Sequence, residues 1–274
     1  MKKFELTAEF VTNIFGKKLF RIKALVAFDN VEKGELGGFV EKEENLSQNG
    51  NAWVSGDAWV YGDARVSGDA QVSGDARVYG DAWVYGNAWV SGNARVSGDA
   101  RVYGDAQVSG DAWVYGNAQV SGDAQVSGNA WVFGNAWVSG DARVYGDARV
   151  YGDAWVYGDA WVSGDARVSG DARVYGDAWV YGDAQVSGDA WVSGNADYAV
   201  VKGFGRYFRA TTFFRCRDEI LRVQCGCFYG NLTQFREIVK KTHGDSKRAK
   251  EYLAIADLME LHFSDEEEKQ EATE

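Results

Sequence analysis

Hydrophobic and polar positions follow a fixed six-residue pattern, Ala-x-Val-y-Gly-Asp/Asn, from Val54 to Val192. The pattern recurs in 24 consecutive copies without insertion or deletion. Because side chains alternate across a β-strand, Ala and Val point to one side while x and y point to the other. Glycine, Asp and Asn tolerate the left-handed backbone angles of a turn. Each copy therefore predicts one short strand with an apolar inner face, followed by a corner.

A period this regular predicts a solenoid, the fold in which every copy has the same surroundings. Three copies close one triangular coil, and successive coils pair with each other as parallel strands. The 24 copies make about eight coils and a rod roughly 38 Å long at about 4.8 Å per strand spacing. The predicted fold class is therefore an all-β, three-sided solenoid.

The segments on either side of the repeat have different patterns. Residues 1–49 contain two β-like runs, 4–11 and 19–28, around a Gly-Lys-Lys turn, which predicts an N-terminal β cap. The solenoid occupies residues 50–196, and an acidic tail occupies residues 265–274. A ββαα module is predicted at 197–264, with strands at 207–215 and 220–228 and helices at 232–242 and 246–263.

Two segments resemble known families. The stretch RIKALVAFDNVEKGELGGFVEKEENLSQNGNAWV, with Gly37-Gly38 before an aromatic residue and Leu46-Ser47-Gln48 after it, resembles the cap and first coil of the YdcK-like bacterial hexapeptide-repeat proteins. That resemblance implies a left-handed parallel β-helix with an N-terminal β cap, and it implies no activity. The stretch CGCFYGNLTQFREIVKKTHGDSKRAKEY resembles a C-terminal module of phage and prophage proteins from gut bacteria, whose role is open.

The charge is concentrated on the repeat. The chain has a net charge of −11, and the repeat holds 18 aspartates against eight arginines, a net of −10. Such a surface repels nucleic acid and attracts basic partners, so we do not expect direct nucleic-acid binding. We expect a cytoplasmic protein of a bacterial host, because no signal peptide or membrane span is evident and three cysteines fit a reducing compartment.

The chemistry of known enzymes on this fold is missing from the repeat. Hexapeptide acyltransferases use a histidine base, and γ-class carbonic anhydrases use three histidines for zinc. The repeat contains no histidine and the whole chain has two. Cys216, Cys225, Cys227 and His243 form the cluster with metal-ligand chemistry. We interpret the cysteines as core residues, with Cys225 and Cys227 on the same face of one strand. We therefore predict no catalytic, cofactor or metal site.

The outward positions carry whatever specificity the repeat has. Trp, Arg and Gln alternate at x, and Ser, Tyr or Phe occupies y. Residues 18 apart stack coil upon coil, and eight of these vertical neighbours are Trp–Arg pairs that can form cation–π stacks. Such columns either only hold the sheets together or form a binding surface. The candidate binding surface consists of Trp59, Arg77, Tyr79, Trp83, Arg95, Trp113, Tyr115, Trp131, Trp137, Tyr151, Trp155, Trp161 and Trp179.

These observations favour a non-enzymatic, phage- or prophage-associated scaffold that binds a protein partner through its repeated Trp, Arg, Tyr and Asp surface. One alternative is an acidic decoy that mimics DNA and inhibits a nucleic-acid-binding host protein. A second is a glycan-binding protein that uses the aromatic columns. A third is an enzyme housed in the C-terminal module. The sequence leaves the partner and the oligomeric state open.

Overall fold

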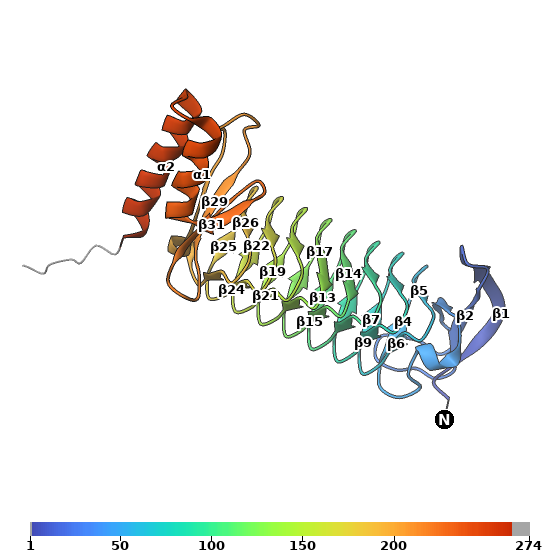
Figure 1. Ribbon diagram of the computed structural model, residues 1–274. Coiled ribbons are helices and arrows are strands. Elements are labelled where there is room, and N and C mark those ends of the chain that lie inside the picture. The colour runs from blue at the N-terminus through green and yellow to red at the C-terminus, as the bar shows by residue number, and fades with distance from the viewer. Residues whose placement is uncertain (1, 265–274) are drawn as a thin grey trace, which may run out of the picture.

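The computed structural model describes residues 2–264 as a straight rod with a β hairpin at one end and two helices at the other (Figure 1). Three parallel sheets form the walls of the rod, which has about nine turns. The predicted acidic tail, residues 265–274, lies outside the described residues. The left-handed winding stays a prediction from the family resemblance.

Each wall takes every third strand of the repeat, and we name the walls by their first repeat strand. The β4 wall contains β4 (Trp53–Val54), β7 (Gln71–Val72), β10 (Trp89–Val90), β13 (Gln107–Val108), β16 (Gln125–Val126), β19 (Arg143–Val144), β22 (Trp161–Val162) and β25 (Trp179–Val180). The β5 wall contains β5 (Trp59–Val60), β8 (Arg77–Val78), β11 (Arg95–Val96), β14 (Trp113–Gly116), β17 (Trp131–Gly134), β20 (Arg149–Val150), β23 (Arg167–Val168) and β26 (Gln185–Val186). The β6 wall contains β6 (Arg65–Val66), β9 (Trp83–Val84), β12 (Arg101–Val102), β15 (Gln119–Val120), β18 (Trp137–Val138), β21 (Trp155–Val156), β24 (Arg173–Val174) and β27 (Trp191–Val192).

The inner positions form one continuous core along the rod. Every repeat Ala from Ala52 to Ala190 is fully buried, and the repeat valines have at most 1% exposure. Backbone N–H groups at the x, y and Asp positions donate to carbonyls of the next coil, as Trp59 does to Ala76 over 2.9 Å and Asp57 to Gly74 over 3.0 Å. Small Ala and branched Val therefore fill the narrow prism while the backbone links the coils, as the pattern predicts.

The solenoid begins earlier than the repeat does. Strand β3 (Leu36–Val40) pairs in parallel with β5, and Leu46 bridges in parallel to Val66. These contacts supply the ninth turn, one more than the 24 hexads alone provide. Gly37 allows this approach, since a Cβ atom there would lie 2.5 Å from the carbonyl oxygen of Val54.

The N-terminal cap is the predicted hairpin. Strands β1 (Phe4–Thr12) and β2 (Lys18–Ala24) are antiparallel, and β2 pairs with β3. Trp53 is buried, unlike the other tryptophans of the repeat. The cap covers it to 2% exposure, and the ring of Phe28 packs edge-on against it at 5.4 Å.

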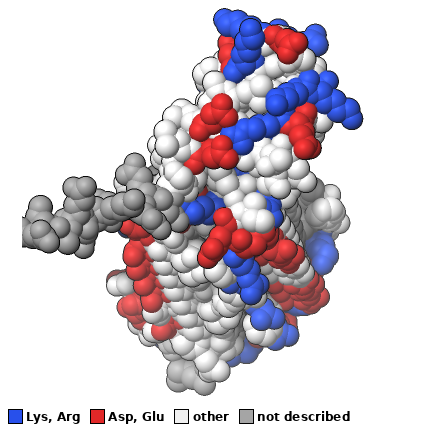
Figure 2. Space-filling model, turned by 60° about the vertical axis from the view of Figure 1, so that its left-hand side comes forward, with Lys and Arg blue, Asp and Glu red and all other residues white. Residues whose placement is uncertain are grey.

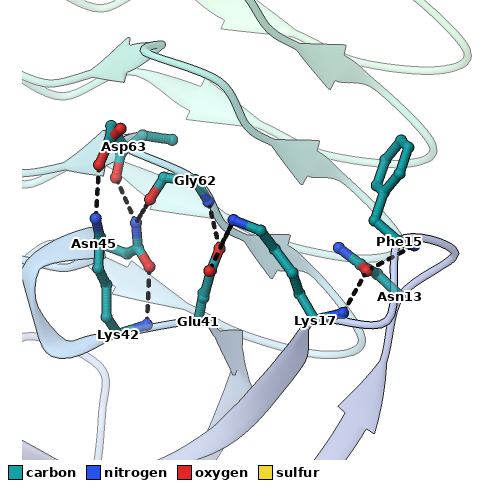
Figure 3. A network of polar contacts seen from close by, with 9 residues as sticks. Asn13, Phe15, Lys17, Glu41, Lys42, Asn45, Gly62 and Asp63 are labelled. Atoms are coloured by element: carbon teal, nitrogen blue, oxygen red, sulfur yellow. Dashed lines mark hydrogen bonds and ion pairs between the residues drawn. The ribbon is translucent and has the colours of Figure 1, made fainter.

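A polar network fastens this cap to the first repeat coil (Figure 3). The Glu41 carboxylate accepts from Gly62 N–H at 2.7 Å and from Lys17 Nζ at 2.8 Å. Burial opposes ionisation of Glu41, but these hydrogen bonds outweigh it and lower the pKa of the carboxyl. Asn45, in the 3₁₀ turn η1 (Glu43–Asn45), donates to the carbonyls of Gly62 and Ala64 at 3.0 and 2.8 Å. Exposed backbone edges of the first coil are thereby satisfied.

The C-terminal module has four strands where two were predicted. After the 3₁₀ turn η2 (Asn195–Asp197), β28 (Tyr198–Val201), β29 (Thr211–Arg215), β30 (Leu221–Cys225) and β31 (Phe228–Asn231) form one antiparallel sheet. The helices α1 (Leu232–His243) and α2 (Lys247–Phe263) follow as predicted, capped by Asn231 and Ser246. The sequence pattern missed β28 because it follows the last hexad directly, and it missed β31 because only Gly226 and Cys227 separate it from β30.

Strand β29 joins the module to the rod. Phe214 in this strand is buried in the solenoid core cluster, and so is Cys216 just after it. Phe213 is buried against the helices. Polar contacts support this docking, with Gln185 N–H donating to Thr212 Oγ1 at 2.9 Å. The module therefore closes the last coil with an apolar face. None of the described helices is both long and apolar enough to span a bilayer.

Candidate functional site

The outward side chains form continuous ladders along the walls. On the β5 wall, Tyr115, Phe133 and Tyr151 stack at ring distances of 4.9 Å with nearly parallel planes. Beside them, Trp113 and Trp131 stack at 5.3 Å. Burial raises the pKa of Tyr115, so this phenol stays protonated at neutral pH. The strand spacing of a β-solenoid thus places rings at stacking distance without further adjustment.

The arginines of the repeat complete these ladders. All eight vertical Trp–Arg pairs of the repeat have the guanidinium over the indole, at 4.7 to 5.9 Å from the ring centroid. Arg77 over Trp59 and Arg95 over Trp113 are the closest, both at 4.7 Å. Among the described ion pairs, none joins an arginine of the repeat to an aspartate of the repeat. The arginines therefore stack within the walls and do not neutralise the corner carboxylates.

The structure distributes the candidate binding residues unequally. The β5 wall brings together Trp59, Arg77, Tyr79, Arg95, Trp113, Tyr115, Trp131 and Tyr151. The β6 wall carries Trp83, Trp137 and Trp155, and the β4 wall carries Trp161 and Trp179. No single site contains all of them, because the walls face three directions.

The aspartates run along the corners between the walls, and Figure 2 shows the red rows that they form on the rod. One corner carries Asp105, Asp123, Asp141, Asp159 and Asp177 on successive coils. At other corner positions Asn replaces the carboxylate. Its side chain hydrogen-bonds to the next coil, as Asn87 Nδ2 does to Asp105 at 2.8 Å. Carboxylates one strand spacing apart repel each other, so an uninterrupted row favours a cationic neighbour.

A groove of about 840 Å³ lies where the C-terminal end of the β4 wall meets β28. Serine occupies the y position of the first five hexads on this wall, and tyrosine enters at Tyr145 and Tyr181. Ser163 lies between them, one coil from each, and leaves a gap between the two phenol rings. Trp161 and Trp179 stack at 4.8 Å along the same groove.

The module completes the groove with Tyr198, Ala199, Val200 and Lys202. Tyr198 packs edge-on against Tyr181, and its hydroxyl donates to the carbonyl oxygen of Trp179. Burial and the neighbouring Tyr181 raise the pKa of Tyr198 to about 12, so it remains a donor. Lys202 and Asp183 form an ion pair at the rim. The sequence reasoning missed Tyr145, Tyr181 and Tyr198, and the only available signal was the change from serine to tyrosine in this column.

The opposite end of the rod has a smaller hollow. It measures about 200 Å³ and lies beside Phe39, Trp59 and Arg77, under the N-terminal cap. Two of these are predicted binding residues, but the hollow can hold little more than a single side chain.

The cysteines do not share one strand face. Cys216 is buried at the end of the solenoid, Cys225 ends β30 half-buried, and Cys227 is exposed in the following turn. The prediction that both thiols of Cys-Gly-Cys face the core is therefore wrong, because the strand ends at Cys225. His243 lies apart from the metal-type cluster of the described residues and stacks on Tyr252 at 6.0 Å.

Asp189, Cys216 and Asp218 lie close enough together to bind a cation. Burial, reinforced by Asp189, raises the pKa of the Cys216 thiol to about 12, which keeps it protonated. Arg222 binds the Asp218 carboxylate at 2.6 Å, and Tyr229 donates to Asp189 at 3.0 Å. Both carboxylates of this cluster are therefore already engaged by protein side chains.

Three parallel walls, apolar inner columns and regular corners define a β-solenoid repeat protein. The YdcK β-solenoid repeat model matches residues 58–74, 70–86, 88–104, 94–107, 106–122, 124–140, 142–158, 148–164 and 166–182. The rod is thus built from YdcK-type β-solenoid repeats, as the resemblance of the repeat predicted. No curated protein matches the chain. The family description specifies a fold and leaves activity open.

Proposed function

We propose that the protein is a non-enzymatic binding scaffold, associated with a phage or prophage and located in the cytoplasm of the bacterial host. It binds a protein partner through its repeated surface. The observation that carries this proposal is the stacking of all eight Trp–Arg pairs within the walls. This stacking leaves ordered aromatic walls between acidic corners, a combination suited to a partner with basic and apolar side chains.

Rigidity supports this role. The aromatic side chains of the ladders are already held by their neighbours, so binding a partner costs little side-chain entropy. Tyrosine and tryptophan also provide large contact areas with few rotatable bonds. A rod with repeated, equivalent positions can in addition hold several copies of one partner, which increases the apparent affinity.

The proposal is tested by capture from host lysate with the full chain as bait. The informative variant replaces Tyr79, Tyr115 and Tyr151 with Ser, the residue at this position in 13 hexads. We expect the variant to fold and to capture at least tenfold less protein than the wild type does. A matched control is Trp89→Gln, which changes an exposed ring on the β4 wall. Equal capture by the wild type and the triple variant would show that the β5 wall is not the binding surface.

A second candidate function is a DNA-mimicking decoy, which the charge density of the corners favours. The repeat has 18 aspartates along roughly 38 Å, or about one carboxylate per 2 Å, against about one phosphate per 1.7 Å in duplex DNA. A decoy would compete with DNA for a nucleic-acid-binding host protein. Captured proteins that release the rod when duplex DNA is added would favour this function, and capture that is insensitive to DNA would favour the scaffold.

A further inference from the structure

Two aromatic columns end under a guanidinium that a terminal module supplies. Arg21 of the N-terminal cap lies over Phe39, which precedes Trp59 in its column, at 4.6 Å. Arg217 of the C-terminal module lies over Trp191, the last indole of the β6 wall, at 5.6 Å. In both cases the chain itself supplies a guanidinium that continues the column.

The last indole of the β4 wall is different. Trp179 stacks on Trp161 at 4.8 Å, and Trp161 takes Arg143 on its other face at 4.8 Å. Within residues 2–264, no cation lies over Trp179, which is 48% exposed and lines the groove. The column Arg143–Trp161–Trp179 therefore lacks a terminal guanidinium like those over Phe39 and Trp191.

The charge around the groove is negative on both sides. Aspartates occupy the two flanking corners on the three coils beside it, with no Asn among them. They are Asp141, Asp159 and Asp177 on one side and Asp147, Asp165 and Asp183 on the other. Lys202 is the one cation that lines the groove in the described structure, and Asp183 pairs with it. The groove is thus complementary to a positively charged ligand.

We propose that this groove is the docking site for an arginine side chain in a basic segment of the partner protein. The guanidinium stacks on the open face of Trp179, beside Tyr181 and Tyr198, and the flanking carboxylates attract the rest of the segment. This inference rests on the proposed function, because it names the chemistry of the protein partner. It adds the C-terminal end of the β4 wall, as the contact for this basic segment, to the aromatic contact on the β5 wall.

Arginine fits this site better than the other candidate ligands do. A planar guanidinium stacks on an aromatic face, whereas an ammonium is a compact, strongly hydrated point charge. The acidic corners repel nucleotides and phosphorylated ligands. A neutral glycan would use the aromatic groove but would gain nothing from the flanking carboxylates, so its binding would be insensitive to salt.

The test compares two labelled probe peptides, Ac-(Gly-Arg)₃-NH₂ and Ac-(Gly-Lys)₃-NH₂, on the full chain by fluorescence anisotropy. We expect the arginine probe to bind about fivefold more tightly than the lysine probe of equal charge. Trp179→Gln removes this preference and leaves the lysine probe unchanged. The fold tolerates this change, since Gln occupies the same position in five hexads.

Trp89→Gln is the matched control. Trp89 lies on the same wall and is 56% exposed, but Asn87 and Asn93 replace the aspartates at its corners. This variant keeps the fivefold preference. Equal binding of both probes to the wild type, or a preference that survives Trp179→Gln, overturns the site. Displacement of the arginine probe by a neutral oligosaccharide at high salt also overturns it, in favour of a glycan.

The two proposals fail separately. If the probe preference holds while no lysate protein is captured, the scaffold role is wrong and the arginine site stands. If a partner is captured and Trp179→Gln changes neither the capture nor the probe preference, the site is wrong and the scaffold role stands.

Discussion

At the scale of single residues, three positions of the hexad determine the solenoid. Ala and Val fill the prism, and the corner Gly has a positive φ and lies directly against the Gly of the next coil. A side chain at this corner meets two obstacles, the left-handed backbone angle and the neighbouring backbone. At Gly182 in the last coil only the backbone-angle obstacle remains, because no further repeat coil packs against this glycine.

Gly110→Ala and Gly182→Ala are expected to differ in stability for this reason. Both glycines have φ +67°, but a Cβ at Gly110 would lie 3.0 Å from the Gly128 nitrogen, whereas none of the described atoms lies within 4 Å of one at Gly182. Both variants lose about 1 kcal/mol of unfolding free energy from backbone strain, and Gly110→Ala loses about 1–2 kcal/mol more from the close contact. Urea denaturation measures the difference. Equal losses of unfolding free energy in the two variants would show that the neighbouring coil moves away from the added methyl group without loss of stability.

Lys3 is a buried titratable residue of the N-terminal cap, and it predicts a pH dependence. Its ammonium donates to the carbonyls of Gly50 and Ala52 at 3.2 and 2.8 Å, and burial lowers its pKa to about 8. The unfolded chain holds this proton up to about pH 10.4. Between pH 8 and 10 Lys3 binds more protons in the unfolded state than in the folded state, so its contribution raises the free energy of unfolding with pH.

Urea denaturation at a series of pH values tests this slope. Below pH 8 Lys3 is protonated in both states and adds no slope. Above about pH 9 the raised pKa of Cys216, and above pH 10 that of Tyr198, give slopes of opposite sign. The Lys3→Met variant removes the titrating amine, so the rise between pH 8 and 9 is expected to disappear and its unfolding free energy to fall above about pH 9. An identical slope in Lys3→Met would assign the effect to another group.

At the scale of elements, the caps decide where the solenoid stops. Strand β29 presents Phe214 to the last coil and Phe213 to the helices, so one strand belongs to both cores. The first and last coils would otherwise leave strand edges unpaired. The sheet of the C-terminal module covers one end of the rod, and β1–β3 cover the other. Uncovered edges of parallel strands pair with other chains.

Phe214→Ala is expected to loosen the C-terminal module. Phe214 is fully buried, so the substitution costs about 3–5 kcal/mol. Tyr207→Ala removes a ring that is 64% exposed and serves as the control, with a loss below about 0.5 kcal/mol. Amide hydrogen exchange in β26 and β27 should rise in the first variant alone. Unchanged protection there would show that the helices, rather than β29, close the rod.

At the scale of the whole molecule, the rod is close to a one-dimensional array. Each coil contacts its two neighbours, so stability is approximately a sum over coils and interfaces. The walls are equivalent in backbone but not in surface. The β5 wall carries the tyrosine ladder, while the β4 wall is mainly serine until the groove. The three walls therefore present different surfaces along the same backbone.

Deleting residues 93–110 is expected to leave a folded rod, because it removes one full coil and restores the register at the junction. Small-angle scattering should show a rod shorter by about 4.8 Å, with both caps retained. Deleting residues 93–101 instead reverses the inward and outward positions downstream and should abolish cooperative unfolding. Failure of the longer deletion to fold would contradict the independence of the coils.

The sequence by itself determined the three walls, their inner columns and the eight Trp–Arg stacks. A strict period gives every copy the same neighbours, so a local pattern there is also a statement about long-range contacts. Only the tertiary structure decided the burial of Trp53, the extra strands β28 and β31, and the groove around Trp179. Each of these depends on how a terminal module docks, and no periodic signal encodes that contact.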